Sequence, residues 1–165
     1  MAKTKEDFQP EVGGFLDDAD GEIINAEFTE AGADYAKMIG GSAPAIGITL
    51  SIESPDLERP LEQWFSIGSG DIWEIKDGGK ELVSVKRPDS HSFRQGSRGY
   101  ALVEAMATAI GAGSVEKGQE FFIKRDRYMT QSDFYTGLSF HWKRKPLPKV
   151  GGGTTDVPLP ETYLG

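Results

Sequence analysis

The sequence predicts a mainly β fold with one helix in a single domain. Residues 45–53 (AIGITLSIE) alternate apolar side chains with small or polar ones, which is the period of a half-buried strand. Glycine and proline separate several such short segments, and only one segment has helical spacing. A length of 165 residues with 38% hydrophobic and 27% charged residues is typical of a globular domain with a core.

The remaining elements follow the same reasoning in chain order. The segment IWEIKDGGKELVSVK predicts a hairpin that turns at Asp-Gly-Gly. Ser97 is a suitable N-cap for a helix whose apolar residues recur every three to four positions, with Gly111 and Gly113 as the stop. The predicted strands cover residues 22–29, 45–53, 61–67, 121–129 and 138–145, and the predicted helix covers residues 97–110.

This order predicts an OB-like barrel, in which five strands form a partly open barrel and the helix lies between strands 3 and 4. Residues 1–20 are interpreted as an N-terminal arm, residues 21–146 as the barrel domain, and residues 147–165 as a flexible C-terminal tail rich in Pro, Gly and Thr. One further helical turn is expected within residues 31–38.

The composition limits the chemistry. The absence of cysteine excludes disulfides and thiolate metal sites, and no apolar run reaches the roughly 20 residues that span a bilayer. The N-terminus does not have the pattern of a secretory signal, so we expect a location in the cytoplasm, without membrane attachment.

No catalytic or metal-binding pattern is found, so we expect neither an enzyme nor a cofactor. His91 and His141 lie fifty residues apart, with no metal-ligand spacing. In DDADGEIINAE, alignment with a calcium loop puts Leu16 at the first ligand position, where it cannot coordinate. The glycine-rich residues 66–71 lack the Lys-Ser/Thr of a phosphate-binding loop.

The charge is divided unevenly along the chain. Residues 1–74 contain 4 Lys/Arg and 16 Asp/Glu, a balance of −12, whereas residues 75–165 contain 14 and 10, a balance of +4. This asymmetry indicates one acidic surface and one that attracts anions, although two ordinary solvated surfaces would give the same totals.

The basic half interleaves cations with aromatic rings, which is the combination that single-stranded nucleic acid requires. On the two predicted C-terminal strands, alternation places Lys124, Tyr128, His141, Lys143 and Lys145 on an outward face, whereas Trp142 falls on the core side. The full set of candidate nucleic-acid-binding residues is Trp64, Trp73, Lys86, Arg87, Arg94, Arg98, Lys124, Arg125, Arg127, Tyr128, Tyr135, His141, Trp142, Lys143 and Lys145.

Four segments carry a resemblance to a known group of proteins: GGFLDDADGEIINAEF, PAIGITLSI, EQWFSIGSGDIWEIKDGGKEL and the helix after SRGY. Over roughly residues 13–145 they are similar to small phage-encoded proteins that accompany replication and recombination genes, some of which are assigned as single-stranded DNA-binding proteins. The resemblance implies binding of single-stranded DNA and recruitment of replication or recombination proteins through the C-terminal tail. The tail departs from the family pattern, since it has only Asp156 and Glu161 as acidic residues.

The leading hypothesis is therefore a phage-type single-stranded DNA-binding protein that coats exposed strands as a homo-oligomer in the host cytoplasm. The alternative is a phage virion structural or assembly protein of the head or tail, with the charge asymmetry as an interface. A third hypothesis is a hydrolase or carbohydrate-binding module that uses the acidic half.

Overall fold

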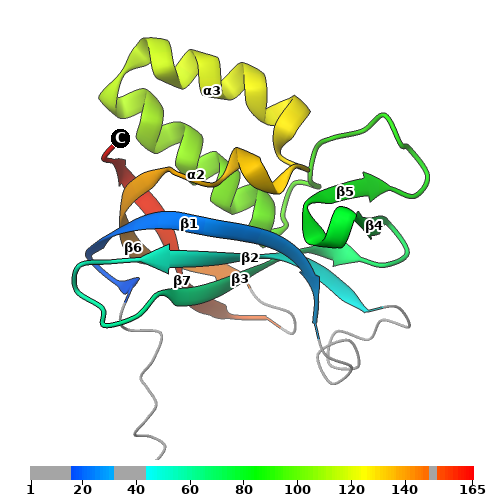
Figure 1. The fold of residues 1–165 in the computed structure, drawn as a ribbon, viewed down its shortest axis with the longest axis horizontal. Coiled ribbons are helices and arrows are strands. Elements are labelled where there is room, and N and C mark those ends of the chain that lie inside the picture. Colours follow the sequence, from blue (N-terminus) through cyan, green and yellow to red (C-terminus); the bar gives the residue numbers. More distant parts are fainter. Residues whose placement is uncertain (1–15, 32–43, 149–151) are drawn as a thin grey trace, which may run out of the picture.

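The computed structural model describes residues 16–31, 44–148 and 152–165, and it is mainly β with two α-helices (Figure 1). The strands are β1 (Ala19–Glu30), β2 (Ala45–Glu53), β3 (Leu61–Ser69), β4 (Trp73–Lys76), β5 (Glu81–Ser84), β6 (Ser139–Pro148) and β7 (Thr154–Tyr163). The helices are α2 (Arg98–Gly113) and α3 (Val115–Tyr128), and two short 3-10 turns cover Asp77–Gly79 and Ser132–Phe134.

Five strands form one antiparallel sheet in the order β3-β2-β1-β6-β7. The alternation predicted for residues 45–53 is confirmed, because Ile46, Ile48, Leu50 and Ile52 are all buried. The predicted hairpin is also confirmed: β4 pairs with β5, and the turn between them uses positive φ angles at Asp77, Gly78 and Gly79.

The sheet is not closed as a barrel, since β3 and β7 remain edge strands that are not paired with each other. Helix α2 contacts both of these edge strands, and its apolar face fills the interior with Leu102, Val103, Met106, Ala109 and Ile110. The predicted N-cap is confirmed, because the Ser97 hydroxyl accepts a hydrogen bond from the Tyr100 N–H at 3.1 Å. Helix α2 therefore covers the opening between the edge strands β3 and β7.

The strand predicted for residues 121–129 is wrong, because this segment belongs to helix α3. Ser114 ends α2 and caps α3, accepting a hydrogen bond from the Lys117 N–H. Phe121 and Arg125 are four residues apart and form the buried side of α3, as helical geometry requires. The described residues consequently have two helices in succession, α2 and α3, between β5 and β6, where one helix was predicted.

The predicted flexible tail is also wrong where the structure describes it. Residues 154–163 form strand β7, which pairs with β6 and buries Val157 and Leu159. Pro158 and Pro160 are compatible with β7 because it is an edge strand, where a missing N–H need not break a ladder. Strand β1 begins at Ala19, so it includes the last two residues of the segment 1–20 that was predicted as an arm. Residues 1–15 and nearly all of the expected turn at 31–38 lie outside the described residues.

Candidate nucleic-acid interface

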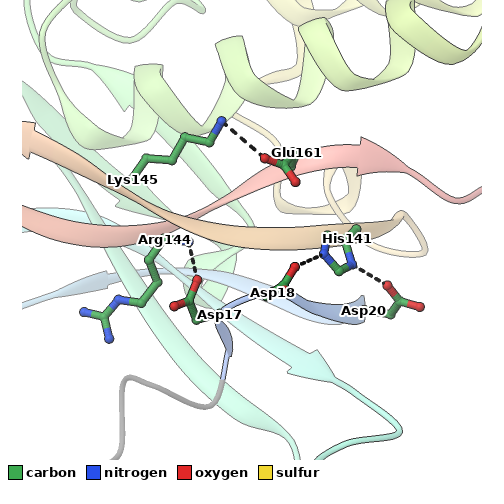
Figure 2. A network of polar contacts seen from close by, with 7 residues as sticks. All are labelled: Asp17, Asp18, Asp20, His141, Arg144, Lys145 and Glu161. Carbon is green, nitrogen blue, oxygen red and sulfur yellow. Dashed lines mark hydrogen bonds and ion pairs between the residues drawn. The ribbon is translucent and has the colours of Figure 1, made fainter.

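The first group of predicted cations lies on β6, and acidic side chains of the same chain contact His141 and Lys145 there (Figure 2). The His141 ring is held between two carboxylates, with Nδ1 at 2.7 Å from Asp20 and Nε2 at 2.8 Å from Asp18. The Lys145 ammonium lies 3.7 Å from Glu161, and the Arg144 guanidinium donates to the Asp156 carbonyl oxygen at 2.9 Å. Two of the residues predicted for an outward binding face, His141 and Lys145, are therefore paired with carboxylates of the same chain, whereas Lys143 is exposed without such a partner among the described residues.

The same contacts attach the start of β1 to β6. The Arg144 backbone N–H donates to the Asp17 carboxylate at 3.0 Å, just beyond the last backbone pair of these strands, Ala19 with Trp142. The Asp20 and Asp18 carboxylates accept hydrogen bonds from the His141 ring, and these bonds raise the pKa of His141 above its usual 6.5. The hydrogen bond and the charge of His141 lower the pKa of Asp18 below 3.8, with a further contribution from nearby Lys143.

We expect this attachment to depend on pH. A raised His141 pKa stabilises the fold fully below about pH 6.5, and the stabilisation is lost as pH rises through the folded-state pKa. A lowered Asp18 pKa stabilises the fold above about pH 3.8, and that stabilisation is lost as pH falls through the folded-state pKa. Thermal melts of the wild type and His141→Gln should therefore differ most at mildly acidic pH and converge at alkaline pH.

The control for this experiment is a direct titration of the His141 ring. Proton NMR of the wild type should give a titration midpoint for His141 above 6.5, and Asp18→Asn should lower that midpoint. A constant difference in melting temperature between the wild type and His141→Gln from acidic to alkaline pH would contradict the role of the charged ring.

The second group of predicted residues lies on α3 and no longer forms a strand face. Lys124 is exposed and lies 3.8 Å from Glu120 one turn earlier, and Arg127 and Tyr128 are also exposed. Arg125 is only 8% exposed, and its guanidinium lies 3.3 Å from the Glu104 carboxylate on α2. Arg125 thus joins the two helices, and its cation is not available to a ligand.

Three of the predicted aromatic residues are in the core. Trp73, Tyr135 and Trp142 are at most 4% exposed. The Tyr135 hydroxyl donates to the Met129 carbonyl oxygen at 2.6 Å, and the Trp142 Nε1–H donates to the Gly21 carbonyl oxygen at 3.0 Å. A buried ring offers no face on which a base can stack. Trp64 is half-buried and lies against Gly47 of the neighbouring strand, on the outer side of the sheet.

The third group, which we call the basic loop, consists of Lys86, Arg87, Arg94 and Arg98 and lies between β5 and the first residue of α2 (Figure 1). Lys86, Arg87 and Arg94 are exposed, and Arg98 is half-buried. Within the described part of the chain, none of the four side chains has an ion pair or hydrogen bond with another residue. These four charges are therefore available, as is that of Lys143 on β6, in contrast to His141 and Lys145.

Phe93 fixes the basic loop to the core. Its ring is 3% exposed and meets Phe28 and Trp73 edge-on, at centroid distances of 6.5 and 6.1 Å. The Phe93 N–H also points to the Met129 sulfur at 3.1 Å. Arg94 is the next residue in the chain and is exposed. The buried Phe93 ring therefore fixes the position of the Arg94 backbone, and with it the region in which the charge of Arg94 lies.

Two hollows flank the N-terminus of α2 and share the wall formed by Gln95, Gly96 and Ser97. The first, of about 550 Å³, is bordered by Ser84, Ser90, Ser92 and Arg94, and Arg94 is the only charged residue among its described lining. The second, of about 460 Å³, is bordered by Arg98, Tyr100, Glu104 and the end of β6. Serine hydroxyls, arginines and a helix N-terminus together suit a phosphate-bearing ligand.

The charge at this helix end is unusual. Helix α2 has no acidic residue in its first turn and begins instead with Arg98. The macrodipole makes the N-terminus of a helix positive, so a carboxylate is favoured there and a cation is not. An arginine at this place adds to the attraction for an external anion.

Sequence reasoning identified the four basic residues but not the serines or Tyr100 that border the same hollows. The N-cap signal at Ser97 was the clue, because it located the helix N-terminus beside Arg94 and Arg98.

A third hollow, of about 470 Å³, lies elsewhere and is bordered by Asp20, Glu22, Glu53 and Glu58. No group of three or more metal-ligating side chains occurs in the described ranges, and no described helix has the length and apolar character needed to cross a membrane.

Comparisons with known proteins give no relative. No protein-family model, no curated protein and no solved structure matches the chain.

Proposed function

We propose that this protein binds single-stranded DNA through the basic loop and the two hollows at the N-terminus of α2. The observation that carries the proposal is a pair of arginines, Arg94 and Arg98, that have no partner among the described residues and lie beside the N-terminus of α2. Serines border the larger of the two hollows, and its described lining contains no acidic residue. Phosphates would lie against Arg94, Arg98 and the helix N-terminus, and Tyr100 provides a half-buried ring close to them.

The proposal includes an OB-like architecture, in which the five-stranded sheet is an open relative of the barrel and α2 closes its gap. Support comes from the antiparallel order of five strands and from the contacts of α2 with both edge strands. In this architecture the binding surface lies at one end of the gap, where α2 begins.

The test is fluorescence anisotropy of a labelled oligo-dT at increasing salt concentration. Binding should weaken steeply with salt, because each neutralised phosphate contributes about 0.7 to the slope of log K against log salt for single strands. The double variant Arg94→Ala/Arg98→Ala should bind more weakly at low salt. Its slope should be smaller by about 1.4 if each arginine neutralises one phosphate.

The matched control is Lys143→Ala/Lys145→Ala, which also removes two positive charges but from the β6 group. Because Lys145 pairs with Glu161 and Lys143 lies near Asp18, this variant should retain most of the affinity and slope. No binding by the wild type at low salt would refute the proposal. Equal losses in both variants would show that net charge matters and that the basic loop is not the site.

A further inference from the structure

The larger hollow beside the N-terminus of α2 contains a hydrogen-bond donor that has no partner among the described residues. This hollow, which we call the serine hollow, is bordered by Ser84, Ser90, Ser92 and Arg94, and also by Trp73 of β4. Trp73 is only 4% exposed, and its Nε1–H donates to no described residue. The Nε1 atom is nevertheless not one of the enclosed polar atoms of the described chain, so it is open to the hollow that Trp73 borders.

Gly68 leaves this donor uncovered. Gly68 lies on β3 and borders the same hollow. A Cβ atom at this position would lie 3.0 Å from Trp73 Cδ1 and 3.2 Å from Trp73 Nε1. The N–H edge of the indole therefore lies at the wall of the hollow where a side chain is missing, while the ring packs against Phe93. A buried indole N–H normally has an acceptor, so an unpaired one in this position indicates a place for an acceptor atom of a ligand.

Ser84 supplies a second donor next to Trp73. The two residues are directly paired across β4 and β5, so their side chains lie on the same face of the hairpin. Ser84 is 8% exposed, and its Oγ accepts a hydrogen bond from the Arg87 N–H at 3.2 Å, whereas its own proton has no acceptor among the described residues. Because Arg94 is the only charged residue in the described lining, a ligand of this hollow needs acceptor atoms.

The serine hollow also has an apolar wall, formed by Ile67, Gly68 and Ile72. Ile72 is 43% exposed, so part of this wall is accessible. A phosphate gains nothing from an apolar surface, whereas the flat face of a base packs well against one. The volume of about 550 Å³ also lies within the roughly 300–1,000 Å³ of small-molecule sites. The hollow therefore fits a whole nucleotide better than a phosphate alone.

We infer that one nucleotide of the bound strand inserts its base into the serine hollow, where a carbonyl oxygen of the base accepts the Trp73 Nε1–H. Its phosphate lies at Arg94 and the N-terminus of α2, so the inference rests on the proposed function and adds the contact that reads the base. A base such as thymine is favoured over adenine. Adenine has no carbonyl oxygen, and its amino group would find no carboxylate in the described lining.

The experiment is proton–nitrogen NMR of the full chain, in which three tryptophans give three indole N–H signals. Trp73→Phe identifies the Trp73 signal by its loss. Oligo-dT should shift this signal, because the N–H gains an acceptor. A deoxyribose-phosphate strand of equal length without bases should leave the signal in place, and oligo-dA should shift it less than oligo-dT.

Gly68→Ala tests the same contact with Trp73 present, because the added methyl group covers the indole N–H. Its affinity for oligo-dT should fall about 3- to 10-fold, as expected for the loss of one hydrogen bond, and its affinity for the strand without bases should not change. Gly113→Ala is the matched control. It lies at the other end of α2, where a Cβ atom meets no neighbouring atom within 4 Å, and it should bind as the wild type does.

Fluorescence anisotropy of the same strands separates the two proposals. If no strand binds, both the proposed function and this inference are wrong. If oligo-dT binds but the Trp73 signal does not move, only the inference is wrong. An equal shift of this signal by the strand without bases or by oligo-dA, or an unchanged affinity of Gly68→Ala for oligo-dT, would also overturn it.

Discussion

Replacement of Trp142 by alanine should lower the free energy of unfolding by about 3–5 kcal/mol, the usual cost of removing a large aromatic side chain from a core. Trp142 is fully buried, packs edge-on against Phe140 at 5.8 Å, and pairs with Ala19 where β6 joins β1. The variant would lose this packing and would also leave the Gly21 carbonyl oxygen without the indole N–H that now donates to it.

Urea denaturation measures this loss, provided that the slope of the transition is unchanged. Trp142→Phe is the matched variant, because it retains an aromatic ring but not the N–H, and its loss should be clearly smaller. Stability close to that of the wild type in the alanine variant would mean that β6 does not depend on this ring. The phenylalanine variant should also bind oligo-dT as the wild type does, since a fully buried ring touches no ligand.

The inner strands of the sheet were predictable because their residues alternate. In β2 the alternating residues Ile46, Ile48, Leu50 and Ile52 are all buried, and the small residues Ala45 and Gly47 between them are buried as well. The helix cap at Ser97 and the turn at Asp77–Gly79 were predictable for a similar reason, since each depends on a short local sequence with a specific backbone requirement.

Helix α3 was misread because it lacks an apolar stripe. Only Phe121 and Arg125 are buried, and Phe122 and Ile123 face the solvent, so the segment FFIKRDRYM shows neither clear helical spacing nor the constraint of a sheet neighbour. Strand β7 was missed for a different reason. Its prolines are typical of a loop, and only the partner strand β6 and the packing of α2 make them compatible with an edge strand.

The candidate site was partly predictable, because charge is visible in a sequence and charge pairing is not. His141 lies more than a hundred residues from Asp18 and Asp20, and only the pairing of β6 with β1 brings them together. In the sequence, the cations of the basic loop cannot be distinguished from those of β6. The fold makes the difference, since it supplies acidic partners to His141 and Lys145 and none among the described residues to Arg94 and Arg98.

The second large effect is expected at the contact between α2 and α3, where two glycines allow the helices to approach closely. A Cβ atom at Gly118 would lie 2.4 Å from the Gly111 Cα and 3.1 Å from its backbone nitrogen. Both are backbone atoms, so a rotamer change cannot relieve the clash and α3 must move away from α2. Gly118→Ala should therefore destabilise the fold by about 1–3 kcal/mol despite the better helix propensity of alanine.

Gly111→Ala is the control, because a Cβ atom there would meet only the Gly118 Cα at an ordinary 3.8 Å. This variant should be neutral or stabilised by up to about 1 kcal/mol, the gain expected when alanine replaces glycine inside a helix. Thermal and urea denaturation of the two variants should thus give opposite signs. Equal effects would contradict the close approach of the two helices, which also brings Arg125 of α3 beside Glu104 of α2.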